Sequence, residues 1–471
     1  MGPRYALDTA GASADLVGAA HGLSPQDLEA AAPRAERAER TLGEARMEGL
    51  AGFLDLPLRG DLADASSEAA EALRGRTEWL VVCGMGGSAL GARALLGALA
   101  AAGPDGVPGS GAPGRPRVLV LDTSDPAAVA PLLDRLPPGT TAWNFVSKTG
   151  RTMETAAVYG AVRSRLEGAL GAGWRERVVV TTDPAKGPLR EEAERERLRT
   201  LEIPPAVGGR WSALSPAGLF PLAAAGVDPR AVLRGASAAA TGFQSGDPGH
   251  NDALRLALWL VLLAEKRGRR HHALALYGRR LAAIGPWWQQ LWSESLGKEG
   301  RGFDATAAEG PALQHSLLQL WMQGPADKAI VFVEAEDPGT DLVIDSPGPP
   351  GADWLERRTF GDLHRALAAG TAAALVGAGR PVLRIRLPDA GPECVGAFLQ
   401  LWMTATALAG PMLGVSPFGQ PGVEEGKRNS AALLGADEGM PSVAAGGAKE
   451  GAKDGDRRSR VEALLDRLRR R

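Results

Sequence analysis

The stretch TEWLVVCGMGGSALG (77–91) joins an apolar run to a glycine-rich turn and then to a segment with helical spacing. The first part, 77–84, contains a continuous apolar run and ends in glycine, which predicts a buried strand. The spacing of apolar residues in 89–101 predicts a helix. The same alternation continues with strands at 117–122, 141–147 and 177–182 and helices at 125–135 and 153–168. Apolar strands that alternate with helices are typical of a parallel sheet covered on both faces.

A second round of the same pattern begins near residue 252. It comprises helices at 252–266, 280–294 and 392–409 and strands at 271–278, 328–334 and 380–388. We therefore expect an α/β fold with two doubly wound halves, although no direct sequence repeat relates them.

The two ends of the chain differ from this α/β pattern. Residues 1–55 are predicted to form a helical extension, in which Ser24-Pro25-Gln26-Asp27 is a helix start with serine as N-cap. The expected α/β domains then cover 56–235 and 236–430. Residues 431–471 are expected to hold a low-complexity linker followed by a basic amphipathic helix, RRSRVEALLDRLRRR.

The composition excludes several classes of protein. A chain of 471 residues with a formal net charge of −2 offers no bulk electrostatic attraction for nucleic acid or a membrane surface. Two cysteines, Cys83 and Cys394, cannot form a disulfide framework and fit a reducing compartment. The first residues lack the pattern of a secretion signal, and the longest apolar run, about Leu254 to Ala264, is too short for a membrane span. We expect a cytoplasmic protein.

Two segments are candidate ligand sites: the glycine-rich turn at 84–91, where backbone can approach a ligand and helix-start N–H groups can bind an anion, and a segment that follows the strand at 141–147. The segment SKTGRTMET (147–155) places three hydroxyls and a lysine where a helix begins, and such a group can wrap a phosphate. Two other interpretations remain open from the residues alone. The segment could be a Ser/Thr cap, and Gly84-x-Gly86-x-x-Ala89 with Asp122 also matches a dinucleotide fingerprint.

The two glycine- and serine-rich segments together resemble the sugar isomerase (SIS) domain, in its phosphoglucose isomerase version. Four further segments resemble that family in the same order along the chain: GGRWSALS (208–215), WQQLWSESLGK (288–298), QHS (314–316) and PFGQPGVEEGK (417–427). The resemblance implies two SIS-type α/β sandwich domains with parallel sheets, a helical N-terminal segment and a C-terminal helical tail.

The resemblance also implies an aldose–ketose isomerase that interconverts glucose 6-phosphate and fructose 6-phosphate through an enediol. Glu294, in a tryptophan-rich segment expected to raise its pKa, would be the base that moves a proton between C2 and C1. Arg210 would stabilise the enediolate, and His315 and Lys427 would open the sugar ring. The family supplies the histidine from the neighbouring subunit, which implies a homodimer.

Substrate contacts are expected from the two loops and from three glutamines. The phosphate would be bound by Gly87, Ser88, Ser147, Lys148, Thr149 and Thr152, and the sugar by Gln289, Gln290 and Gln420. The chemistry needs no metal or other cofactor, and the Cys and His spacings form no metal-binding set.

Two departures from the family pattern leave the sugar preference open. Gly419 replaces an acid or amide, and Arg151 adds a charge beside the phosphate loop. The alternatives are an isomerase of different or broader preference, such as one that also accepts mannose 6-phosphate, a non-catalytic SIS sugar-phosphate sensor, and a dinucleotide oxidoreductase. Retention of the four proposed catalytic residues argues against the sensor.

Overall fold

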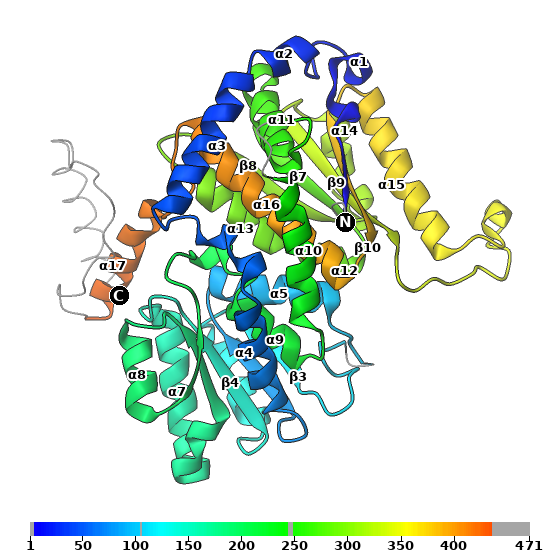
Figure 1. Ribbon diagram of the computed structural model, residues 1–471. Coiled ribbons are helices and arrows are strands. Elements are labelled where there is room, and N and C mark those ends of the chain that lie inside the picture. Colours follow the sequence, from blue (N-terminus) through cyan, green and yellow to red (C-terminus); the bar gives the residue numbers. More distant parts are fainter. Residues whose placement is uncertain (1–3, 104–105, 244–247, 436–471) are drawn as a thin grey trace. The chain divides into compact units, whose positions relative to one another are not determined.

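The computed structural model describes residues 4–103, 106–243 and 248–435. The chain divides into two compact units, Met1–Pro417 and Phe418–Arg471. Both sheets belong to the first unit, one in the upper part of Figure 1 and the other in the lower part. The expected α/β class with two parallel sheets is confirmed.

The first sheet has five parallel strands in the order β3-β2-β4-β5-β6. The strands are β2 (Trp79–Cys83), β3 (Arg117–Leu121), β4 (Thr141–Val146), β5 (Val178–Thr182) and β6 (Arg199–Glu202). The helices that alternate with them are α5 (Gly87–Leu99), α6 (Pro126–Arg135), α7 (Met153–Leu170) and α8 (Pro188–Glu196). Side chains of α7 and α8 pack with buried residues of the strands in one hydrophobic core, on the opposite side of the sheet from α4 (Gly60–Glu71) and α9 (Pro216–Ala224) (Figure 1).

The second sheet has the order β1-β10-β9-β7-β8. Its strands are β1 (Ala6–Asp8), β7 (His271–Tyr277), β8 (Asp304–Gly310), β9 (Lys328–Asp337) and β10 (Val382–Asp389). Four of them are parallel, whereas β1 pairs with β10 in the antiparallel direction. The N-terminal segment is therefore not wholly helical as expected, because its first residues complete the edge of this sheet.

Helices cover both faces of the second sheet as well. Alternate residues of β7, Ala273, Ala275 and Tyr277, share a core with Trp321 and Leu375. These last two residues belong to α14 (Leu318–Gln323) and α15 (Phe360–Gly377). Against the other face lie α11 (Asp252–Arg267), α13 (Gly285–Leu296) and α16 (Pro392–Leu413), and the short α12 (Arg279–Ala282) precedes α13.

The long helix α16 is the central helix of the first unit. It packs against α10 (Pro229–Gly242), α11 and α3 (Ala32–Met47). By length and composition alone α16 could cross a membrane, but 94% of its most apolar window is buried inside the protein, as in a core helix. The rest of the N-terminal segment forms α1 (Ala14–Val17) and α2 (Pro25–Glu29), and α2 begins at the predicted serine cap.

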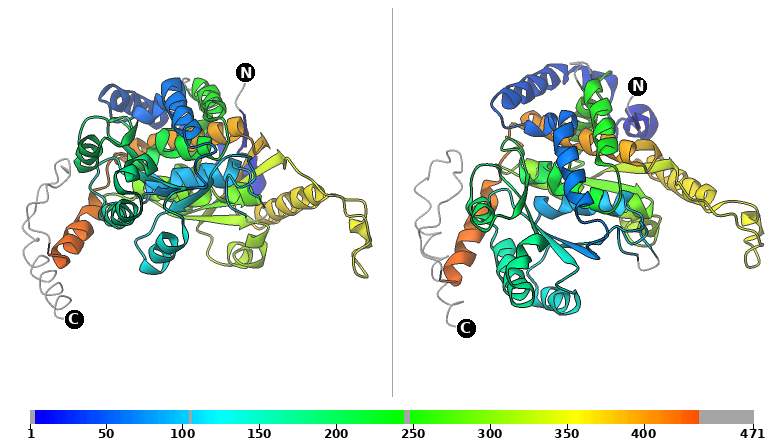
Figure 2. Two further views of the ribbon diagram at one scale, coloured as in Figure 1. Left: turned by 90° about the horizontal axis from the view of Figure 1, so that it is seen from below. Right: turned by 60° about the horizontal axis from the view of Figure 1, so that its bottom comes forward.

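Two segments extend from these cores. Residues 338–359, between β9 and α15, reach away from the rest of the first unit in both views of Figure 2. In the second unit, the described part holds α17 (Glu424–Leu433). The predicted linker and basic helix beyond residue 435 lie outside the described residues.

Candidate active site

The first sheet has its topological switch point between β2 and β4. From β2 the chain crosses to β3 on one side, whereas β4 and the later strands lie on the other side. Ligands of doubly wound proteins bind beyond the carboxyl ends of strands at such a point. The glycine-rich loop after Cys83 and the Ser/Thr-rich loop after Val146 both begin there.

The glycine-rich loop packs closely on the segment that carries Arg210. A Cβ atom added to Gly87 would lie 2.3 Å from the carbonyl carbon of Gly209 and 2.4 Å from the nitrogen of Arg210. The hydroxyl of Ser212 also donates to the carbonyl of Gly209 at 2.7 Å. Only glycine leaves room for this approach. The backbones of the first loop and of the Arg210 segment are therefore packed directly against each other. Ser88 lies in the first turn of α5.

The second loop is held together by its own hydroxyls. The hydroxyls of Ser147 and Thr152 lie 3.1 Å apart, and the Gly150 N–H donates to the Ser147 oxygen at 3.1 Å. Thr149 accepts from the backbone N–H of Arg151 at 3.3 Å, and Thr152 is the N-cap residue of α7. These residues form a polar turn before a helix of 18 residues, which is the geometry of an anion site.

Lys148 turns its ammonium group to the backbone. Its Nζ donates to the carbonyl of Pro205 at 2.6 Å. Burial lowers the pKa of Lys148, and the negative charge of Asp183 partly opposes that shift. Lys148 is thus a half-buried cation beside the second loop.

Arg210 is the most deeply buried cation of the site, with 4% of its side chain exposed. Its Nε donates to Ser295 Oγ and its Nη2 to the carbonyl of Pro417, both at 2.7 Å. Its Nη1 lies 3.8 Å from Glu294 Oε1. Burial lowers the pKa of Arg210, and Glu294 opposes this by favouring the charged form. The guanidinium is fixed before any substrate binds.

Glu294 lies on a half-buried face of α13 together with Gln290, one turn earlier. Gln290 Nε2 donates to Glu294 Oε2 at 2.9 Å, while Gln290 Oε1 is buried and has no partner among the described residues. The tryptophans of α13 belong to its other, fully buried face, where Trp292 packs on Trp402. The carboxylate therefore meets an amide and a guanidinium, and its aromatic neighbours in sequence point into the core.

The structure brings Glu294, Arg210, Gln290 and the glycine-rich loop together. A Cβ atom on Gly86 would lie 2.9 Å from Gln290 Nε2, so α13 touches the loop that follows β2. Sequence reasoning missed two neighbours, Ser295 and Lys298, although both stand in the quoted WQQLWSESLGK segment. Both could have been found from their place in this segment, which supplies four polar side chains to one site.

Among the described residues of the first unit, Gln289 and His315 are not joined to Glu294 by a hydrogen bond or ion pair. Gln289 donates to the carbonyl of Ala305 at 3.2 Å, away from Glu294. His315 is exposed at the end of a 3-10 turn, and no hydrogen bond or ion pair joins it to Glu294 within the described residues. Gln420 and Lys427 belong to the second unit, where Lys427 Nζ lies 2.8 Å from Glu424 Oε1.

The acidic residue of the dinucleotide interpretation has a partner within the protein. Asp122, the proposed ribose ligand, is paired with Arg93 at 2.7 Å. Within residues 4–103, 106–243 and 248–435, no group of three or more His, Cys, Asp or Glu side chains is placed to hold a metal ion.

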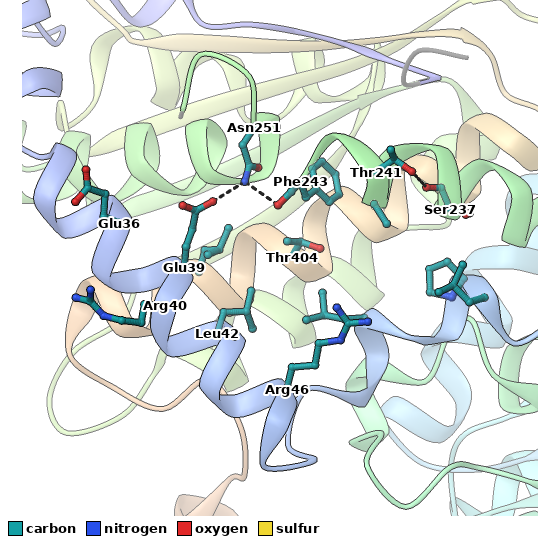
Figure 3. Close-up of a pocket in the computed structure, with 16 residues that line it drawn as sticks. Glu36, Glu39, Arg40, Leu42, Arg46, Ser237, Thr241, Phe243, Asn251 and Thr404 are labelled. Carbon is teal, nitrogen blue, oxygen red and sulfur yellow. Dashed lines mark hydrogen bonds between the residues drawn. The ribbon is translucent and has the colours of Figure 1, made fainter. Parts of the chain in front are cut away.

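A cavity of about 560 Å³ lies outside this site, between α3, α10 and α16 (Figure 3). Glu39, Arg46 and Thr404 line it, and Asn251 Nδ2 donates to Glu39 at 2.9 Å. Burial raises the pKa of Glu39, and the Asn251 hydrogen bond partly opposes the rise. None of the predicted site residues lines this cavity.

Known proteins match the chain over most of its length. The family model described as phosphoglucose isomerase matches residues 68–332. A glucose-6-phosphate isomerase of Rubrobacter xylanophilus is 40% identical over 421 residues, which are 88% of this chain and 95% of that protein. A glucose-6-phosphate isomerase of Thermus thermophilus is 38% identical over 418 residues, 86% of this chain and 95% of that protein.

Solved structures share the fold of this chain. The crystal structure of a hypothetical protein from Thermus thermophilus superposes with a TM-score of 0.82 at 37% identity, covering 91% of this chain and 99% of that one. A glucose-6-phosphate isomerase from Chlamydia trachomatis shares the fold, with a TM-score of 0.68 at 23% identity over 81% of this chain and 74% of that one. The chain belongs to the phosphoglucose isomerase family.

Proposed function

We propose that this protein is a glucose-6-phosphate isomerase that interconverts glucose 6-phosphate and fructose 6-phosphate, a step of glycolysis and gluconeogenesis. The relatives that match nearly the whole chain carry that name. The observation that supports the chemistry best is the Glu294–Arg210 pair, with 3.8 Å between carboxylate and guanidinium. A carboxylate beside a fixed cation is what proton transfer through an anionic intermediate requires.

The proton transfer is assigned to Glu294. Its carboxylate removes the proton from C2 of the open-chain aldose and returns it to C1, while the proton of the C2 hydroxyl passes to O1. The C1 aldehyde thereby becomes a hydroxyl and the C2 hydroxyl becomes a ketone. The half-buried carboxylate is aimed by Gln290, and this fixed position reduces the entropy lost on reaching the transition state. The unpartnered Gln290 oxygen is available to accept from a sugar hydroxyl.

Stabilisation of the negative charge on the enediolate is assigned to Arg210. Its guanidinium is anchored by Ser295 and Pro417 and is buried, so its charge acts in a low-dielectric setting. Ring opening is assigned to His315 and Lys427. Both side chains are exposed, so a second chain or a bound sugar could approach them.

Phosphate binding is assigned to the two loops of the first sheet. Ser147, Thr149 and Thr152 form a hydroxyl-rich turn before α7, with Lys148 beside it and with Gly87 and Ser88 at the start of α5. Gln289 and Gln420 are proposed as additional sugar contacts. Two helix N-termini and one cation suit a dianionic phosphate.

We propose that the enzyme is a cytoplasmic homodimer in which His315 completes the partner's site. The exposed position of His315 supports this, as do exposed apolar side chains on the arm at 338–359, among them Leu342 and Trp354 with 63% and 68% exposure. Patches of this kind mark protein–protein contacts. Free, buried Cys83 and Cys394 fit a reducing compartment.

We also propose that residues 56–235 and 236–430 act as the two SIS-type domains. The five strands of the first sheet fall in the first range. Four of the five strands of the second sheet fall in the second range, and β1 comes from the extension at 1–55. The proposed tail domain at 431–471 begins within α17.

The deciding experiment is a coupled assay of fructose 6-phosphate conversion to glucose 6-phosphate, with Glu294→Gln beside the wild type. The amide keeps the shape and the hydrogen bond to Gln290 but cannot take a proton, so kcat should fall by about 10³-fold or more. KM should change little. An inactive wild type that still binds hexose phosphates would overturn the proposed function, and a fully active variant would overturn the assignment of the base.

A further inference from the structure

The connection from α16 to the second unit is held by four cationic side chains. Each donates to a backbone carbonyl of the segment 412–417: Arg34 to Met412, Arg301 to Leu413, Lys298 to Ser416 and Arg210 to Pro417. The Met412 and Leu413 carbonyls lie in the last turn of α16, where carbonyls lack intrahelical partners and carry partial negative charge, and the Ser416 and Pro417 carbonyls follow the helix end. All four are backbone acceptors outside the regular hydrogen bonding of the helix. Cations are therefore their natural partners, and here distant parts of the chain supply them.

The last two of these contacts belong to the active site. Arg210 is the proposed enediolate ligand, and Lys298 follows Glu294 by four residues, just beyond the end of α13 at Leu296. Lys298 Nζ donates to the Ser416 carbonyl at 2.5 Å, one residue before the carbonyl that Arg210 holds at 2.7 Å. Two neighbouring carbonyls are thus fixed by the two cations that flank the proposed base.

The charged groups around Lys298 include those of the candidate active site. The groups that face it are Arg210 from the GGR segment, Glu294 from α13 and Glu299 from its own loop. Burial, and after it the positive charge of Arg210, lower the pKa of Lys298 to about 8, while the two glutamates partly oppose the shift. The ammonium is therefore a charged group at neutral pH that the site itself makes easy to deprotonate.

We propose that Lys298 is a positioning residue for the isomerase reaction. Together with Arg210 it fixes the Ser416–Pro417 carbonyls, from which the segment carrying Gln420 and Lys427 departs, and it keeps a second positive charge beside Glu294. This inference rests on the proposed function for its catalytic part. Its anchoring part concerns the backbone alone.

The first test compares Lys298→Met, Lys298→Arg and Arg301→Met in the full-length protein. Methionine keeps much of the length of the stem but removes the charge and donor, so kcat should fall about 10- to 100-fold with less than about 3-fold change in KM. Arginine should restore most of the activity. Arg301→Met is the matched control because it removes a cation from the same connection, at a carbonyl three residues before that of Ser416, and it should keep kcat within about 3-fold of wild type.

The second test is the pH profile of kcat between about pH 6.5 and pH 10. Deprotonation of Lys298 above about pH 8 removes its charge, so wild-type kcat should fall as the pH rises through that value. Lys298→Arg keeps its charge throughout, and the alkaline fall should move upward by at least about one pH unit. An unchanged alkaline limb in that variant would assign the limb to another group and overturn the electrostatic role.

The third test needs no activity. Amide hydrogen exchange of residues 412–416 should accelerate in Lys298→Met and return towards wild type in Lys298→Arg. Normal exchange in Lys298→Met would overturn the anchoring role, and an equal loss of kcat in Arg301→Met would show that only general support of the helix end matters. If the wild type lacks isomerase activity, the proposed function fails together with the catalytic part, while the exchange result still decides the anchoring.

Discussion

At the residue scale, two glycines that face each other near Arg210 differ in what they tolerate. Gly87 faces the Gly209 and Arg210 backbone so closely that a Cβ atom would meet main-chain atoms at 2.3 and 2.4 Å. Main-chain atoms cannot swing aside as a side chain does, so any substitution must separate the two segments. Gly209 itself has nothing within 4 Å of an added Cβ atom. Gly87 therefore sets the distance between the glycine-rich loop and the backbone of Arg210, and Gly209 does not.

We therefore expect Gly87→Ala to lower kcat by about 10²-fold, because a displacement of about 1 Å in a catalytic group costs that much. The free energy of unfolding should fall by about 1–3 kcal/mol through overpacking. Gly209→Ala is the matched control and should stay within about 3-fold of wild-type kcat. Steady-state kinetics and urea unfolding measure both effects. Similar activity in the two variants would show that the loop adjusts.

At the scale of elements, the strongly apolar strands could be predicted, and the strands that are very short or weakly apolar could not. The central strands are runs of Val, Leu and Ile such as WLVVC in β2, and burial on both faces produces that pattern in any sequence. By contrast, β1 and β6 have three and four residues, and β8 reads DATAAEG, with few β-branched or large side chains. Pairing with a longer neighbour makes these segments strands, and that information lies elsewhere in the chain.

The candidate site also has one part that could be predicted from the sequence and another that could not. The two loops after β2 and β4 could be predicted as candidate anion sites because they place glycine and hydroxyl residues where helices begin, and Glu294 and Arg210 follow from the family resemblance. The contact of Arg210 with the Pro417 carbonyl joins residues 207 positions apart, and that of Lys298 with Ser416 joins residues 118 apart. A backbone carbonyl has no signature in the sequence, so such anchors are visible only in the fold.

The start of α2 gives a prediction about an element. Asp27 forms a capping box with Ser24 and accepts from Lys266 and Arg267, at 2.8 and 2.7 Å, in the last turn of α11. The Lys266 hydrogen bond, with that of the Ser24 backbone, lowers the pKa of Asp27 to about 2. At pH values above the ordinary carboxyl pKa of about 4, a lowered pKa stabilises the folded state. This contribution is lost as the pH falls towards about 2.

Asp27→Asn should therefore lower the free energy of unfolding at pH 7 by about 1–2 kcal/mol, after allowance for solvent screening. The difference from wild type should shrink between about pH 4 and pH 2. Urea unfolding at several pH values measures it. Asp64→Asn is the control, because Asp64 forms an exposed pair with Arg230 and should change stability by less than about 0.5 kcal/mol. A constant difference at all pH values would show that the carboxylate charge contributes nothing.

At the scale of the whole molecule, the position of His315 bears on the assembly. Glu294 and Arg210 are joined within one chain, whereas His315 is exposed and makes no hydrogen bond or ion pair with either among the described residues. A symmetric dimer repeats each contact twice, so a histidine that enters the partner's site completes two sites at once. Such an arrangement predicts that two different inactive variants can restore each other.

The prediction is tested by mixing Glu294→Gln with His315→Ala, each inactive alone, under conditions that exchange subunits. A mixed dimer holds one site with an intact glutamate from one subunit and an intact histidine from the other, while its second site lacks both. Random exchange makes about half of the dimers mixed, so about a quarter of wild-type activity should return. If His315 acts within its own chain, every site keeps one defect and no activity returns. Sedimentation of the mixture checks that dimers are present, and a monomeric wild type with full activity would contradict the shared site directly.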